Sequence, residues 1–150
     1  GGQHYSYLLK QMRAFKSGER YAALMAGQVD NLSDQDLRDI SAYYADMERV
    51  EGTAEGEDLE LGERIYRAGI ADEGIPACLA CHSPQGLGNG PAAFPVLAGQ
   101  NADYVAAQLR AYRSGERQTD EDMGGMMRGV AGELDDNEIE AVGAYVHGLQ

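Results

Sequence analysis

The residues of this sequence that could do chemistry together are Cys78, Cys81 and His82, which form a single C-x-x-C-H motif. Two cysteines at this spacing can add to the two vinyl groups of haem, and the next residue then ligates the iron. A C-x-x-C motif that forms a redox disulfide usually lies at the start of a helix in a βαβ unit, and the sequence lacks such a unit. A zinc site would need a second cysteine pair, and His4 and His147 lie far away, so we expect those two at the surface.

Much of the chain around this motif is an internal sequence repeat with two copies. Residues 2–20 (GQHYSYLLKQMRAFKSGER) align with residues 99–117 (GQNADYVAAQLRAYRSGER) at an offset of 97, and residues 24–47 align with residues 126–149 at an offset of 102. The second copy therefore has five extra residues, within QTDEDMGGM. An internal repeat defines the folding unit. The counterpart of C-x-x-C-H would precede residue 1, so we expect the chain to start inside its first domain.

The repeated unit reads as an amphipathic helix, a loop and a second amphipathic helix. In the second copy Asn101 can cap the first of these helices, and the last helix begins near Asp135; in the first copy Ser33 caps the matching helix. A further helix pattern over residues 59–70 has no counterpart upstream. Nothing alternates with a period of two for long enough to indicate a sheet, so the sequence predicts an all-α fold.

A methionine is the first candidate for the second axial ligand, because a thioether raises the reduction potential of haem iron. The chain has six: Met12, Met25, Met47, Met123, Met126 and Met127. The repeat selects Met25 and Met127, which align with each other in the loop between the two helices. Met126 aligns with a leucine and Met123 lies in the insertion. Met12 and Met47 lie on apolar helix stripes, where a core role is expected.

Composition sets broader bounds on function. Small helical units bury little apolar surface, so each would depend on a metal or cofactor for stability. A net charge of −13 argues against nucleic acid and anionic lipid as partners and favours a basic docking surface on another protein, although solubility alone also explains acidity. No apolar run is long enough to span a bilayer, and no signal peptide is present. We expect a soluble chain whose export signal has already been removed.

Three segments carry a family resemblance. CLACHSPQGLGNGPAAFPVLAGQ, YVAAQLRAYRSGER and a loop methionine followed by LDDNEIEAVGAYV resemble a class I cytochrome c domain, and the doubling resembles the di-haem cytochrome c4 family. The resemblance implies an all-α fold of two tandem class I cytochrome c domains. Residues 1–50 would be the C-terminal part of an incomplete first domain, residues 51–58 an acidic linker, and residues 59–150 a complete domain.

The resemblance also implies roles for single residues. Cys78 and Cys81 would attach one haem c, with His82 as the proximal ligand and Met127 as the distal one. The carbonyl of Pro95 would accept a hydrogen bond from the ligand histidine and so fix its orientation.

In the same way, Gly62 and Tyr66 would lie where the helix at 59–70 crosses the last helix at Tyr145. Met25 would be the distal ligand of a second haem, present only if the missing segment is present. The chain lacks the cysteines and histidine of that site. It is a fragment of a two-haem protein, or its first domain has lost its haem, or another polypeptide supplies the segment. Tyr5, Tyr7, Tyr21, Tyr43 and Tyr44 are expected in the core or in domain contacts.

The resemblance implies an electron-transfer protein rather than an enzyme. Its partners would be redox proteins of a respiratory chain, such as a quinol-oxidising complex and a terminal oxidase, with transient contact to membrane-bound complexes. The alternative is a cytochrome subunit that accepts electrons from a dehydrogenase, such as a flavoprotein oxidising a sulfur compound. A haem enzyme or gas sensor would need Met127 displaced. Haem attachment through cysteines and the absence of other cysteines favour the periplasm.

Overall fold

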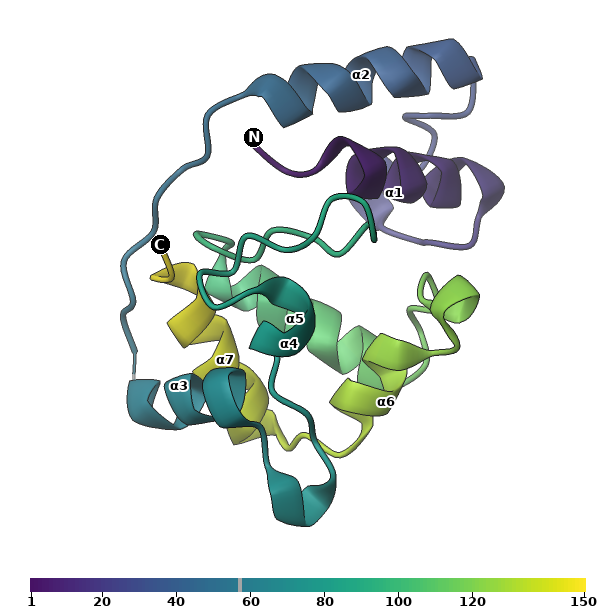
Figure 1. Ribbon diagram of the computed structural model, residues 1–150. Coiled ribbons are helices and arrows are strands. Elements are labelled where there is room, and N and C mark those ends of the chain that lie inside the picture. The colour runs from purple at the N-terminus through teal and green to yellow at the C-terminus, as the bar shows by residue number, and fades with distance from the viewer. Residues whose placement is uncertain (57) are drawn as a thin grey trace.

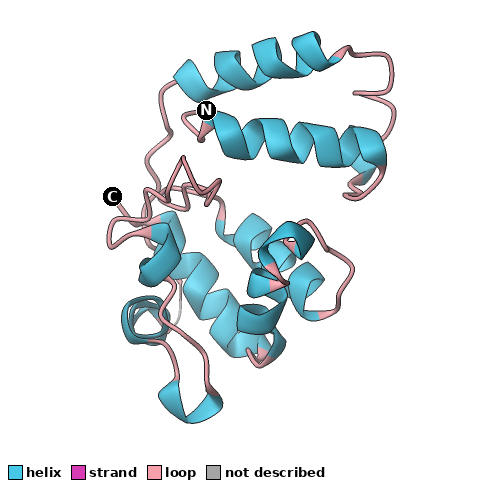
Figure 2. Ribbon diagram, turned by 45° about the vertical axis from the view of Figure 1, so that its right-hand side comes forward, coloured by secondary structure: helices cyan, strands magenta, loops and turns pink. Residues whose placement is uncertain are grey.

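The two copies of the repeat form two helical units, which lie one above the other in the computed structural model (Figure 1). The structure describes residues 1–56 and 58–150. The first unit contains α1 (Tyr5–Ser17), η1 (Ala23–Met25) and α2 (Asp34–Asp46). The second unit contains α3 (Leu59–Ala68), η2 (Ala71–Glu73), α4 (Leu79–His82), α5 (Ala102–Arg113), η3 (Glu121–Met123), α6 (Met126–Gly132) and α7 (Asp136–His147). Across these residues the elements are helices and loops without a strand (Figure 2), as predicted.

The last helix of each unit begins with the same capping box. In α2 the Ser33 hydroxyl accepts a hydrogen bond from Asp36 N at 3.2 Å, and the Asp36 carboxylate accepts one from Ser33 N at 2.7 Å. In α7 Asp135 and Glu138 exchange the same two bonds at 2.8 and 2.9 Å. These bonds satisfy backbone donors that a helix N-terminus leaves unpaired. The helix starts predicted at Ser33 and Asp135 are therefore confirmed.

In the second unit too, residues close in sequence determine where helices begin and end. Asn101 caps α5 by accepting a hydrogen bond from Tyr104 N at 2.9 Å, as predicted. The helix predicted over 59–70 ends two residues earlier, at Ala68. Gly69 takes a φ of 70°, which favours glycine, and the chain then turns back on itself through a bridge between Ile70 and Ile75.

The second unit has the larger core, because α7 packs against both α3 and α5. At the crossing of α3 with α7, a Cβ added to Gly62 would lie 2.1 Å from the carbonyl oxygen of Ala141. The rings of Tyr66 and Tyr145 pack at the same place, with centroids 5.6 Å apart. Gly62 is thus what lets the two helix backbones approach so closely.

The first unit has a small core made by Leu9, Val29 and Leu37. α2 packs chiefly against α1, so its outer face is exposed, whereas the matching face of α7 is covered by α3. The prediction that the apolar residues of this region lie in the core or in contacts is wrong for Met47, Tyr5, Tyr21, Tyr43 and Tyr44, which are 41% to 77% exposed. It holds for Met12, which packs against this core.

The segment predicted as a linker, residues 51–58, runs along the C-terminal end of α7, with Glu57 outside the described residues. A Cβ added to Gly52 would lie 2.1 Å from His147 O, and one added to Gly148 would lie 2.2 Å from Ala54 N. Gly52 and Ala54 are therefore packed against the C-terminal end of α7.

The N-terminal residues of the first unit contact the loop between α4 and α5 of the second unit. The Gln3 amide makes two hydrogen bonds with the backbone of Val96, donating to its carbonyl at 2.9 Å and accepting from its N–H at 2.8 Å. The Nε2 atom of His4 lies 2.7 Å from the carbonyl oxygen of Leu87. His4 and His147 were expected at the surface, and both are partly exposed, each with a ring nitrogen within hydrogen-bond distance of a backbone carbonyl oxygen.

A polar cluster joins α1 to α5. The buried guanidinium of Arg117 donates to the Tyr7 hydroxyl at 2.9 Å, to the Gln11 amide oxygen at 3.0 Å and to the Gln108 amide oxygen at 2.6 Å. Arg20 makes the corresponding set of hydrogen bonds, related to that of Arg117 by a two-fold exchange of the copies. It donates to Gln11 at 2.8 Å, to the Tyr104 hydroxyl at 2.8 Å and to Gln108 at 3.0 Å. The repeat relates the pairs Tyr7 and Tyr104, Gln11 and Gln108, and Arg20 and Arg117. The contact is thus self-complementary, like that of a two-fold dimer.

Candidate functional site

The C-x-x-C-H motif forms a single helical turn. The backbone N–H groups of Cys81 and His82 both bond to the carbonyl of Cys78, at 3.2 and 3.0 Å, so the three side chains emerge from one turn and line one cavity. The two cysteines form no disulfide, and burial raises the pKa of the Cys78 thiol to about 11. Tyr66 fixes the end of this turn, because its buried hydroxyl donates to the carbonyl of Ser83 at 2.6 Å. The sequence indicated only the helix-packing role of Tyr66.

His82 is buried, with 6% of its surface exposed, and its Nδ1 atom lies 3.0 Å from the carbonyl oxygen of Pro95. Nδ1 must carry the proton of this bond, since a carbonyl can only accept. Burial lowers the pKa of His82, and the bond to Pro95 partly opposes that shift. The neutral imidazole therefore keeps Nε2 as a free lone pair, the form in which histidine binds a metal.

The support of His82 extends into the first unit. Gln3 holds Val96, the residue after Pro95, by both its backbone groups. Sequence reasoning did not single out Gln3. The sequence could have pointed to Gln3 only through the repeat, in which it aligns with a second glutamine, Gln100.

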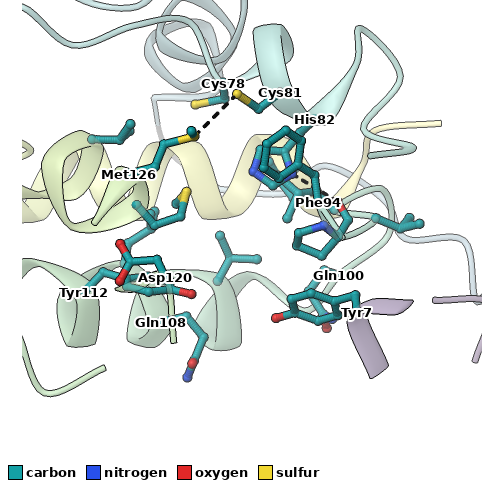
Figure 3. Close-up of a pocket in the computed structure, with 18 of the residues that line it drawn as sticks. Tyr7, Cys78, Cys81, His82, Phe94, Gln100, Gln108, Tyr112, Asp120 and Met126 are labelled. Atoms are coloured by element: carbon teal, nitrogen blue, oxygen red, sulfur yellow. Dashed lines mark hydrogen bonds between the residues drawn. The ribbon is translucent and has the colours of Figure 1, made fainter. Parts of the chain in front are cut away.

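The cavity has a volume of about 270 Å³, and its mostly apolar lining comes from α1, α4, α5, α6 and α7 and from the loop over residues 93–97. Figure 3 shows Cys78 and Cys81 at one edge, His82 beside Phe94, and Met126 across from His82. The ring centroids of Phe94 and His82 are 6.3 Å apart. An apolar cavity with few, convergent polar groups is typical of a cofactor site.

Three methionines reach this cavity: Met123, Met126 and Met127. Met127 is half-buried against the core of the second unit, whereas Met126 is 42% exposed and its sulfur lies 4.0 Å from the Cys81 sulfur. Met127 was expected in a loop, but it is the second residue of helix α6. Met25 lies elsewhere, packed against the core of the first unit.

The donor set suits a covalently attached haem. Two thiols, an imidazole with a free Nε2 and the thioethers of three methionines line one apolar cavity. Elsewhere in the described residues, no group of three or more histidine, cysteine, aspartate or glutamate side chains could hold a metal ion. Cys78, Cys81, His82, Pro95 and Met127 are thus brought together, and Met25 is not.

Crossed helices around such a cavity define a c-type cytochrome. The family model described as cytochrome c matches residues 59–150. The chain is 44% identical to cytochrome c4 of Azotobacter vinelandii, over 99% of this chain and 74% of the relative. It is 38% identical to a thiosulfate dehydrogenase electron acceptor of Stutzerimonas stutzeri, over 93% of this chain and 64% of that protein. The crystal structure of reduced recombinant cytochrome c4 from Pseudomonas stutzeri superposes with a TM-score of 0.96 at 43% identity, covering 100% of this chain and 83% of that one.

The chain belongs to the cytochrome c4 family. It is accordingly an electron-transfer protein and not an enzyme, with redox proteins as partners. The match to the cytochrome c4 structure confirms the predicted fold of tandem class I cytochrome c domains. The cytochrome c match together with the C-x-x-C-H sequence gives residues 59–150 one covalent haem c.

Proposed function

We propose that this protein carries single electrons between redox proteins of a respiratory chain, with the haem iron held by His82 and Met127. The observation that supports this most is that His82, with Nε2 free, and Met127 line the same apolar cavity. When bound, the haem supplies the Fe(III)/Fe(II) couple. His82 and Met127 would together hold the iron of a bound haem and leave no place on it for a substrate, so the site would transfer electrons only.

The side chains of the cavity have separate tasks in this function. Cys78 and Cys81 form the covalent attachment. Pro95 accepts the Nδ1 proton of His82 and thereby fixes the tautomer and the ring orientation of the ligand. The apolar walls exclude water, which favours the less charged state of the couple and raises its potential. The tight crossing at Gly62 keeps the cavity rigid, so little rearrangement accompanies each electron.

The test is ligation in the oxidised holoprotein. The near-infrared absorption band of methionine bound to ferric haem should be present in the wild type and in Met123→Leu and Met126→Leu. It should disappear in Met127→Leu, while pyridine haemochrome assay still finds the haem attached. A band that survives in Met127→Leu would contradict the assignment of the distal ligand.

We further propose that residues 1–50 are the C-terminal part of a first cytochrome c domain, residues 51–58 the linker and residues 59–150 the complete domain. Exposure of Tyr43 supports this, because its counterpart Tyr145 is packed against Tyr66 of α3. Met25 is the distal ligand of a second haem if the segment that completes this domain is present. Measuring haem content and intact mass on one natural sample decides whether Met25 is a ligand. One haem per polypeptide would mean that Met25 is only a core residue.

The partners we propose are a quinol-oxidising complex as donor and a terminal oxidase as acceptor, each met through a basic surface. The net charge of −13 supports this and disfavours nucleic acid. We place the protein in the bacterial periplasm, with transient contact to membrane-bound complexes. Among the described residues no helix could cross a bilayer.

A second candidate function is to accept electrons from a dehydrogenase that oxidises a sulfur compound. It is favoured by the 38% identity to a protein named as a thiosulfate dehydrogenase electron acceptor. Stopped-flow reduction separates the two functions, using either a quinol-oxidising complex with quinol or thiosulfate dehydrogenase with thiosulfate. Copurification with a flavin-bearing subunit would identify a flavoprotein as the dehydrogenase.

A further inference from the structure

The five-residue insertion of the second copy contains a buried carboxylate, that of Asp120. Only 4% of Asp120 is exposed, although its neighbours Glu121 and Asp122 are exposed. A buried carboxylate is costly unless it is paired and hydrogen-bonded. Its contacts therefore indicate what the insertion does.

Asp120 holds the first turn of helix α6. One carboxylate oxygen accepts a hydrogen bond from Arg128 N at 2.9 Å, and the other accepts one from Arg128 Nε, also at 2.9 Å. Arg128 is the third residue of α6 and directly follows Met127. Asp120 thus caps the helix from outside it, and the charge of Arg128 strengthens the contact.

The backbone of Asp120 organises the approach to the same helix. Its carbonyl accepts hydrogen bonds from Met123 N at 2.9 Å and from Gly125 N at 3.0 Å. Gly124 and Gly125 both have positive φ, 68° and 74°, which lets the chain reverse into α6. Side chain and backbone of one residue therefore fix both the loop before Met127 and the turn after it.

The first copy lacks this arrangement. Its loop is five residues shorter, and Ala26 stands where the second copy has Arg128. Met25 correspondingly ends the short 3-10 helix η1 instead of lying in an α-helix. The contacts by which Asp120 fixes the start of a helix are therefore found beside Met127 and not beside Met25.

We propose that Asp120 is a positioning residue that keeps the Met127 sulfur at the distal position by fixing the start of α6. For an outside ligand to take that position, Met127 must move away, and the first turn of α6 must open. The bonds made by Asp120 add to the cost of that opening. This inference rests on Met127 as the distal ligand, the proposed function above.

Imidazole binding to the oxidised holoprotein measures this cost. Asp120→Ala removes the cap and the ion pair, so apparent imidazole affinity should rise about tenfold, equivalent to about 1.4 kcal/mol. Asp120→Asn keeps an oxygen that can accept from Arg128 N but loses the charge, so its affinity should lie between wild type and Asp120→Ala. The control is Asp122→Asn, which makes the same charge change on the same loop, at an exposed residue paired with Lys10.

Affinity in both Asp120 variants equal to that of Asp122→Asn would overturn the proposal. If Asp120→Ala does not fold, Asp120→Asn decides alone: affinity above the control supports the proposal, and affinity equal to the control overturns it. The near-infrared methionine band of the wild type tests the proposed function separately. Its absence would mean that Met127 is not the ligand, whereas its presence with unchanged imidazole affinity would reject only the role of Asp120.

Discussion

The guanidinium of Arg117 donates a hydrogen bond to the hydroxyl of Tyr7 at 2.9 Å, although the two residues are 110 positions apart in the chain. Its counterpart in the repeat, Arg20, donates to the Tyr104 hydroxyl at 2.8 Å. Each copy of the repeat therefore binds the tyrosine of the other. Because Tyr7 and Arg117 also line the haem cavity, the first unit forms part of the wall of the second unit's site.

Removing Arg117 should destabilise the protein more than removing Arg20. Arg117 is 6% exposed and bonds to neutral acceptors only, with no salt bridge to a carboxylate among the described residues. Arg117→Leu leaves the Tyr7 hydroxyl without its donor and leaves the Gln11 and Gln108 amide oxygens with Arg20 alone, so it should lower the free energy of unfolding by about 3 kcal/mol. Arg20→Leu, at a half-buried site, should cost about 1 kcal/mol. Denaturant unfolding of the holoprotein measures both, and equal losses would show that the cluster is not anchored at Arg117.

Gly62→Ala should disrupt the crossing of α3 with α7. The added Cβ would lie 2.1 Å from a backbone oxygen of Ala141, which cannot move without shifting α7. We expect a loss of about 3 kcal/mol or more, typical of overpacking against a backbone. Thermal unfolding should show it as a lower Tm.

The matched control is Gly129→Ala, in helix α6, where an added Cβ meets nothing within 4 Å. Alanine favours a helix over glycine, so this variant should be unchanged or more stable by up to about 1 kcal/mol. Similar Tm losses for the two variants would mean that close helix approach is not the reason for Gly62.

Local features of this chain were predictable from sequence, and long-range contacts were not. The caps at Ser33, Asn101 and Asp135 depend on residues three positions apart, so the sequence carries their whole signal. The contacts of Gln3 with Val96 and of Arg117 with Tyr7 span 93 and 110 residues and leave no local pattern. The only trace of these contacts in the sequence is that the repeat matches Gln3 with Gln100, Tyr7 with Tyr104 and Arg20 with Arg117.

The errors have the same origin. An apolar stripe shows that one helix face can be buried, but it does not show what covers that face, so Tyr43 and Met47 were expected inside and are exposed. Met127 was expected in a loop because the repeat aligns it with Met25, between the two helices of each copy. The carboxylate of Asp120, eight positions before Arg128, starts a helix there instead. No cap pattern has that spacing.

Acid stability should depend on Asp136 in a defined range of pH. The hydrogen bond from Arg113, at 2.6 Å, and then that from Arg110 lower the pKa of Asp136 from its ordinary value of 3.8. Folding therefore favours the ionised form. The resulting stabilisation is complete above pH 3.8 and is lost as the pH falls below 3.8 through the folded-state pKa.

The variant Asp136→Asn lacks this titration. Its deficit in unfolding free energy relative to wild type should be constant above pH 3.8 and should shrink at lower pH. Denaturant unfolding at a series of pH values measures the difference. Asp72→Asn, at an exposed carboxylate without a salt bridge in the described chain, is the control for the charge change alone. A deficit in Asp136→Asn that is independent of pH down to acid unfolding would rule out the ion pair as its cause.

Electron transfer to a basic partner should slow as salt is added. The chain has a net charge of −13, and acidic residues are concentrated in TDED (119–122) and ELDDNEIE (133–140). At 0.1 M ionic strength the Debye length is about 10 Å, so charges that steer a partner at longer range are screened. Between low and physiological salt, the second-order rate with a basic redox protein should fall about tenfold or more. Stopped-flow mixing with an acidic redox protein is the control, and there the rate should rise, because salt screens repulsion. If neither rate responds to salt, the net charge does not steer docking and the docking surface is uncharged.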